Sequence, residues 1–262
     1  MHPLTSAWLE ALERRHLADL TLSEVSRALR ALSSCYVERR EKLVSGGPLS
    51  SAGKRAAFAL FYGPQHFVIL QKIVNAMKEA GALADRGPGT LIDLGCGTGA
   101  AGAAWAVSAG IPAIQGFDRN AWAIEEAAWT YRHFQLRGRA ARRDIGSAKV
   151  VGADQEGRRP RAGRAVLAAY AANELEPRGR EALLAALLDA HKAGDSILVV
   201  EPIARRSLPW WSKWEAAFLS AGGRTDEWRF PAELPDTARK LARAAGLDPR
   251  ELTARSLLLS RR

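Results

Sequence analysis

The first 80 or so residues carry apolar side chains at helical spacing and show no alternating pattern typical of a strand. Ser23 is a candidate N-cap for a helix whose apolar positions are Val25, Leu29, Leu32 and Tyr36. Gly46-Gly47-Pro48 then predicts a break in the chain. Two further helices are expected over residues 52–61 and 65–80, separated by Gly63-Pro64.

After Gly87-Pro88-Gly89, short apolar runs alternate with helical segments such as 120–134 and 179–191. The expected strands are 90–94, 114–117, about 138–143, 165–171, 196–200, about 224–230 and 254–260. This alternation predicts an α/β, Rossmann-like fold with a mostly parallel sheet covered on both faces. The last two strands lack a long helix between them and are candidates for an antiparallel edge pair.

We therefore divide the chain into a helical region, residues 1–86, which we expect to act as a lid and substrate region, and an α/β domain, residues 87–262. The length of 262 residues suits one large domain with a helical extension. No apolar run reaches the ~18 residues that a membrane span needs. Charged residues interrupt the first 20 positions where a signal peptide would be apolar, so we expect a cytoplasmic protein without membrane contact.

Charge and cysteine content narrow the function classes. The formal net charge is +10, which is typical of nucleic-acid-binding proteins but also of arginine-rich chains in general. The densest basic block, residues 137–164, has no interleaved aromatic side chain that could stack on bases. Cys35 and Cys96 form no metal-binding spacing, so no metal is expected.

The sharpest motif is the run Asp-Leu-Gly-Cys-Gly-Thr-Gly at residues 93–99, which follows the first expected strand. Glycines at Gly95, Gly97 and Gly99 allow a tight turn and a close approach of the backbone to a ligand, with Cys96 as a small residue inside the turn. In open α/β sheets, ligands bind at this carboxyl end of the strand.

Two cofactors compete for this turn. Gly97, Gly99 and Gly102 match the dinucleotide spacing G-x-G-x-x-G, in which a helix N-terminus receives a pyrophosphate. Asp93 would repel that diphosphate, whereas it would suit the ammonium and sulfonium charges of S-adenosylmethionine. The acid before the turn therefore favours S-adenosylmethionine.

Acids end the next two strands. Asp118, 19 residues after Gly99, is a candidate acceptor for both ribose hydroxyls, although it could instead cap the following helix, and Arg119 could lie along the adenine. Asp144 could accept the adenine amino group while Ile145 packs against the ring. The alternative for Asp144 is a surface acid that balances neighbouring arginines.

The fourth strand lies beside the first in such a sheet, so its tip faces the reactive methyl group. Asn173, also a cofactor contact, could orient the acceptor atom, and Glu174 could take a proton or hold a cationic substrate. Further candidate substrate residues, each with a structural alternative, are Tyr62, His66, Glu201, Trp210 and Trp211, and Trp214 belongs to the same aromatic stretch.

Residues 93–99, Asp118, Asp144 and Asn173-Glu174 resemble the successive motifs of class I S-adenosylmethionine-dependent methyltransferases over residues 90–262. The resemblance implies a seven-stranded sheet with the last strand antiparallel, S-adenosylmethionine as methyl donor and S-adenosylhomocysteine as product. Segments 22–29, 36–40 and 55–64 are similar to methyltransferase-like proteins associated with the small ribosomal subunit, which implies an rRNA or ribosome-assembly role. The chain lacks the C-terminal cysteine cluster of that family.

Three functions stay open at this point. The first is methylation of rRNA or a ribosomal component, which the charge and the narrower resemblance favour. The second is methylation of a small molecule at N or O, which Glu174 and the tryptophans of 210–214 favour, because an acidic pocket suits a cationic amine. The third is a non-catalytic ribosome-assembly factor that keeps the methyltransferase fold.

Overall fold

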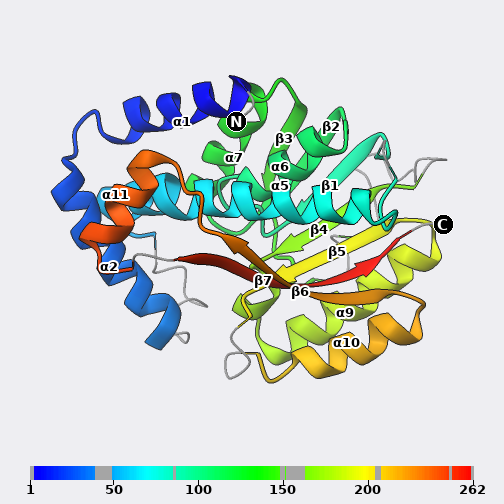
Figure 1. Ribbon diagram of the computed structural model, residues 1–262. Coiled ribbons are helices and arrows are strands. Elements are labelled where there is room, and N and C mark those ends of the chain that lie inside the picture. Colours follow the sequence, from blue (N-terminus) through cyan, green and yellow to red (C-terminus); the bar gives the residue numbers. More distant parts are fainter. Residues whose placement is uncertain are drawn as a thin grey trace.

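The computed structural model describes residues 3–38, 49–84, 87–147, 151, 163–203, 208–247 and 250–260 (Figure 1). Several sequence features lie outside these ranges, namely Arg39, Arg40, residues 46–48, the predicted boundary at residue 86, and the basic residues Lys149, Arg158, Arg159 and Arg161.

One seven-stranded sheet organises the described chain, in the order β3-β2-β1-β4-β5-β7-β6. Its strands are β1 (Thr90–Leu94), β2 (Ala113–Asp118), β3 (Arg137–Arg142), β4 (Ala165–Ala169), β5 (Ser196–Glu201), β6 (Arg224–Pro231) and β7 (Glu251–Leu259). The first five strands pair in parallel, and β7 is antiparallel to both β5 and β6. The predicted Rossmann-like fold and the antiparallel pairing of the last two strands are confirmed.

Helices cover both faces of this sheet (Figure 1). They are α1 (Pro3–His16), α2 (Leu22–Glu38), α4 (Ala52–Ala57), the π-helix η1 (Phe58–Tyr62), α5 (Gly63–Glu79), α6 (Ala100–Ser108), α7 (Ala121–His133), the 3₁₀ turn η2 (Ala172–Glu174), α9 (Pro177–Lys192), α10 (Trp211–Ser220) and α11 (Asp236–Ala244). Helices α5, α6 and α7 lie on one face, and α9 and α10 lie on the other.

Alternation along each strand divides the core into two layers. Leu91 and Leu167 point into the layer under α5, α6 and α7, whereas Ile92 and Val166 point into the layer under α9 and α10. Because both faces are covered, β4 is apolar throughout and β5 is apolar from Ile197 to Val200, so the sequence shows them as continuous apolar runs.

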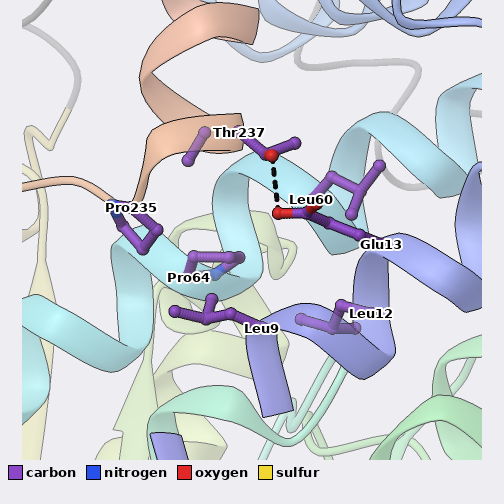
Figure 2. Close-up of a pocket in the computed structure, with 8 residues that line it drawn as sticks. Leu9, Leu12, Glu13, Leu60, Pro64, Pro235 and Thr237 are labelled. Atoms are coloured by element: carbon purple, nitrogen blue, oxygen red, sulfur yellow. Dashed lines mark hydrogen bonds between the residues drawn. The ribbon is translucent and has the colours of Figure 1, made fainter. Parts of the chain in front are cut away.

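The N-terminal helices share their core with the α/β part. Phe67 and Leu70 of α5 are fully buried in the same cluster as Trp105 of α6. Helices α1, η1 and α11 meet at a small hollow, where the hydroxyl of Thr237 donates a hydrogen bond of 2.5 Å to Glu13 (Figure 2). The proposed division near residue 86 therefore does not coincide with a gap in the described hydrophobic core.

Two local expectations are wrong. Gly63-Pro64 does not interrupt the helix, because α4, η1 and α5 follow one another directly and the Gly63 N–H bonds to the Phe58 carbonyl across a π turn. The wider turn accepts a proline because it already departs from the regular helical bonding pattern. The helix α2 is opened by Thr21 rather than Ser23: the Thr21 hydroxyl accepts the Glu24 N–H, and the Glu24 carboxylate accepts the Thr21 N–H.

Candidate cofactor and active site

The glycine turn joins the carboxyl end of β1 to α6. Gly95, Gly97 and Gly99 all have positive φ angles, of 69°, 51° and 76°. Space is as restrictive as conformation, because a Cβ at Gly95 would collide with Ala171 and one at Gly99 would lie 2.7 Å from the Tyr131 ring. The turn therefore needs glycine on both grounds, and it brings backbone N–H groups to the edge of the sheet.

Asp118 stands directly beside this turn. Its Oδ2 accepts the Gly97 N–H at 3.0 Å, and its Oδ1 accepts the Asn120 N–H at 2.8 Å. The helix α7 is capped by Asn120, whose side chain accepts the Ala123 N–H, so Asp118 is not the N-cap. Each carboxylate oxygen keeps a lone pair beyond these bonds, which leaves Asp118 able to accept further donors.

Asp93 lies beneath the turn and is only 1% exposed. Its Oδ2 accepts the Tyr131 hydroxyl at 3.2 Å, and the Gly102 N–H of α6 also bonds to the carboxylate. Burial raises the pKa of Asp93 to about 7, the two hydrogen bonds oppose that rise, and Asp118 adds to it. Direct contact of Asp93 with a cofactor stays a prediction; the observed bonds hold the turn against α6.

The loop after β3 presents the two predicted neighbours differently. Asp144 is exposed, and its Oδ1 accepts the Gly146 N–H at 2.9 Å. Ile145 is 7% exposed, and its Cδ1 lies 3.3 Å from the position that a Cβ on Gly95 would take. The apolar side chain of Ile145 thus lies against the glycine turn, and the acidic side chain of Asp144 lies on the surface.

An ion pair connects the ends of β2 and β4. Arg119 Nη2 lies 3.7 Å from Glu174 Oε2, with side chains 38% and 35% exposed. Desolvation raises the pKa of Glu174 to about 7, Arg119 opposes the rise and Asp118 adds to it. Glu174 is therefore poised to exchange a proton near neutral pH.

Glu201, at the end of β5, is fully buried and holds the turn that carries Asn173 and Glu174. Its Oε1 accepts the Asn173 N–H at 3.1 Å, and the Ala172 N–H also bonds to the carboxyl. Its Oε2 has no hydrogen-bond partner among the described residues. Burial raises the pKa of Glu201 to about 8, so the carboxyl is mostly neutral at pH 7.

Aromatic side chains of the N-terminal region reach the same edge. His66 stacks on Tyr170 with 4.1 Å between centroids and 12° between planes. Tyr62 and Phe58 lie 6.1 and 6.4 Å from the His66 ring, and the Phe58 ring lies 3.5 Å from where a Cβ on Gly97 would be. Burial lowers the pKa of His66 to about 4, which keeps the imidazole neutral at pH 7.

The tryptophans of 210–214 lie on the opposite face of the sheet from this cluster. Trp211 and Trp214 are 3% and 0% exposed in the core under α9 and α10. Trp210 packs on both, and the Arg180 guanidinium lies 5.4 Å from its ring. Core packing accounts for Trp211 and Trp214, while a substrate role for Trp210 and Trp211 stays a prediction.

Sequence reasoning missed Phe58, Tyr131 and Tyr170 as residues of this region. Gly116 and Gly138, inside β2 and β3, were the available signal for Tyr131, because glycine within a strand often marks the close approach of another group. Tyr170 has a positive φ of 57° just after β4, which its place in the expected apolar strand 165–171 does not indicate.

No family model matches the chain, and no curated protein matches it. The solved structures that resemble it include an O-methyltransferase family protein from Burkholderia thailandensis (16% identity, 80% of this chain and 61% of that chain, TM-score 0.49). Another is the plantazolicin methyltransferase BpumL in complex with a monoazolic desmethylPZN analogue and SAH (10% identity, 92% of this chain and 98% of that chain, TM-score 0.48). A third is a putative RNA methyltransferase from Pyrococcus horikoshii (10% identity, 74% of this chain and 84% of that chain, TM-score 0.46). The fold assignment rests on the strand order of this chain itself.

Within the described residues, no helix is both long and apolar enough to cross a membrane. The same part of the chain contains no group of three or more histidine, cysteine, aspartate or glutamate side chains arranged to hold a metal ion. Cys96 is a buried thiol whose pKa is raised well above its usual value by burial, which disfavours the thiolate.

Proposed function

We propose that this protein is an S-adenosylmethionine-dependent methyltransferase. The observation that carries the proposal is the bond from the Gly97 N–H to Asp118 Oδ2, which fixes an acceptor carboxylate beside the glycine turn. If its ribose binds Asp118, the amino acid part of S-adenosylmethionine would lie over the turn, at the carboxyl edge of β1. Ile145 supplies an apolar contact next to Gly95 for the base.

Asp93 favours this cofactor over a dinucleotide. Its carboxylate accepts the Gly102 N–H in the first turn of α6, where a dinucleotide site receives a pyrophosphate. Bringing a diphosphate to a helix end that already holds an acid adds like charge, whereas a sulfonium and an ammonium are attracted to it.

S-adenosylmethionine supplies an activated methyl group for an in-line displacement. The chain has to align the acceptor and exclude water. Glu174 is the candidate base, because its raised pKa lets it accept a proton from the acceptor and release it near neutral pH. Asn173 is the candidate orienting residue, and Glu201 fixes its backbone. Phe58, next to Gly97, is the candidate lid contact from the N-terminal region.

For the acceptor, we propose rRNA or another component of the small ribosomal subunit. The net charge of +10 and the resemblance of the N-terminal segments support it. A small cationic or aromatic acceptor is the second candidate, because Glu174 lies at the edge where the aromatic rings of Phe58, Tyr62, His66 and Tyr170 gather. A cofactor-binding assembly factor without activity is the third.

Transfer of a labelled methyl group separates these candidates. The protein and a Glu174→Gln variant would be incubated with labelled S-adenosylmethionine and either small-subunit particles lacking methylation, free rRNA or a set of amines and phenols. Label in RNA, lost in the variant and suppressed by salt, is the expected result. Label in a small molecule alone would replace the first acceptor with the second, and cofactor binding without any transfer would favour the third.

A further inference from the structure

Tyr131 of α7 fills the space directly beneath the glycine turn and is fully buried. A Cβ at Gly99 would lie 2.7 Å from its ring, one at Gly116 would lie 2.5 Å from its hydroxyl, and one at Gly138 would lie 2.5 Å from its Cβ. Glycines from the turn, from β2 and from β3 thus leave room for this one side chain. Packing this close restricts both the ring and the turn above it.

The Tyr131 hydroxyl bonds to buried polar groups. It donates to Asp93 Oδ2 at 3.2 Å and also interacts with the Cys96 thiol of the turn. Burial raises the pKa of Tyr131 well above its ordinary value, so the hydroxyl stays a neutral donor. The groups that face Asp93 are therefore Tyr131 from α7, Cys96 from the turn, the Gly102 N–H from α6 and Asp118 from β2.

We infer that Tyr131 is a positioning residue of the cofactor turn: its ring supports Gly99, and its hydroxyl holds the Asp93 carboxylate against α6. Tyr131 itself is covered by the turn and acts on the cofactor only through it. The inference rests on the proposed function in so far as the ligand is S-adenosylmethionine. The support of the turn by Tyr131 is a property of the protein alone.

The test compares Tyr131→Phe with the wild type, because phenylalanine keeps the ring and removes only the hydroxyl. The dissociation constant of S-adenosylmethionine is expected to rise about three- to tenfold at pH 7, the range for loss of one buried hydrogen bond. Loss of the Tyr131 bond raises the pKa of Asp93, so the loss of affinity on acidification should begin at a higher pH in the variant than in the wild type.

Phe134→Leu is the matched control. Phe134 is 4% exposed at the end of the same helix, and its ring packs on Trp8 of α1 and Phe67 of α5. The control should lose stability yet bind the cofactor with the wild-type pH dependence. If Tyr131→Phe also keeps the wild-type affinity and pH dependence, the positioning role is wrong.

Hydrogen exchange of the backbone amides of residues 97, 99 and 102 measures how firmly the turn is held in the absence of any ligand. Faster exchange at these amides in Tyr131→Phe, but not in Phe134→Leu, is the expected result. Unchanged exchange in Tyr131→Phe would overturn the inference even if the cofactor binds. Faster exchange in a protein that binds no S-adenosylmethionine would instead retain the support of the turn and reject the proposed function.

Discussion

The imidazole of His66 lies flat on the phenol ring of Tyr170, with 4.1 Å between the ring centroids. His66 belongs to the first turns of α5, and Tyr170 follows β4 with a positive φ of 57°. The stack therefore joins the N-terminal helices to the tip of the strand that leads into Asn173 and Glu174. A left-handed tyrosine is a strained conformation that surrounding contacts have to maintain.

Replacing His66 with phenylalanine tests the protonation state in this stack. The folded pKa of about 4 lies below the unfolded value near 6.5, so the unfolded chain binds more protons and stability falls as pH drops through this window. Between pH 7 and pH 5 the wild type should lose about 2 kcal/mol of stability from this group, or ~5 °C in melting temperature. In thermal unfolding, His66→Phe should lack that part of the decline in stability between pH 7 and pH 5. An identical decline in both proteins would contradict a neutral, partly buried His66.

Glu201 should tolerate glutamine but not leucine. Glutamine keeps an oxygen that accepts the Ala172 and Asn173 N–H groups, whereas leucine leaves both without an acceptor at a cost of about 2–4 kcal/mol. The folded pKa of about 8 exceeds the unfolded value, so the stability that the neutral carboxyl contributes is lost as pH rises toward 8. In urea unfolding, the free energy of unfolding of Glu201→Gln should therefore rise relative to that of the wild type between pH 5 and pH 8. Equal destabilisation by glutamine and leucine would disprove the holding role.

Alanine substitutions at two glycines with almost the same φ distinguish the effect of backbone strain on stability from the effect of turn geometry on cofactor binding. Gly95 (φ 69°) has no room for a Cβ, whereas Gly81 (φ 66°) has open space around it. Alanine at Gly81 should cost about 1–2 kcal/mol of stability and leave S-adenosylmethionine affinity unchanged. Alanine at Gly95 should reduce the affinity at least ~10-fold, because the turn must move away from Ala171. Equal affinities of the two variants in a binding titration would show that the turn is not the cofactor site.

The pair between Arg119 and Glu174 should set the titration of Glu174. Arg119 lowers the pKa of this carboxyl, so Arg119→Met should raise it from about 7, by less than about one unit because both side chains are partly exposed. Carbon-13 NMR of labelled glutamate carboxyls reads this titration directly. Arg132→Met, on the exposed side of α7, should leave it unchanged; a downward movement in Arg119→Met would contradict the pairing.

The sequence predicts the strands well because their burial is simple. Residues 90–94 form β1 as predicted, and the other parallel strands differ from expectation by one or two residues at their ends. Burial on both faces makes β4 and most of β5 continuous apolar runs. The insertion of β7 between β5 and β6 was not predicted, because strand order depends on long-range pairing that no local pattern encodes.

The site is less readable because its geometry depends on distant contacts. The glycine turn and Asp118 follow from local chemistry, and the structure places them side by side. The continuous passage of the helix through Gly63-Pro64 depends on packing over the sheet, which overrides local turn propensity. The positions of Tyr131 and Glu201 depend on groups 38 and 28 residues away in the chain.

Calorimetric titration of S-adenosylmethionine into the wild type and an Asp118→Ala variant tests the central proposal most directly, with Asp144→Ala, an exposed acid on the neighbouring loop, as a comparison. The proposal predicts binding in the micromolar range, about −8 kcal/mol, which Asp118→Ala abolishes and Asp144→Ala weakens far less. Absence of binding by the folded wild type, or equal binding by Asp118→Ala, would contradict a cofactor site at the glycine turn.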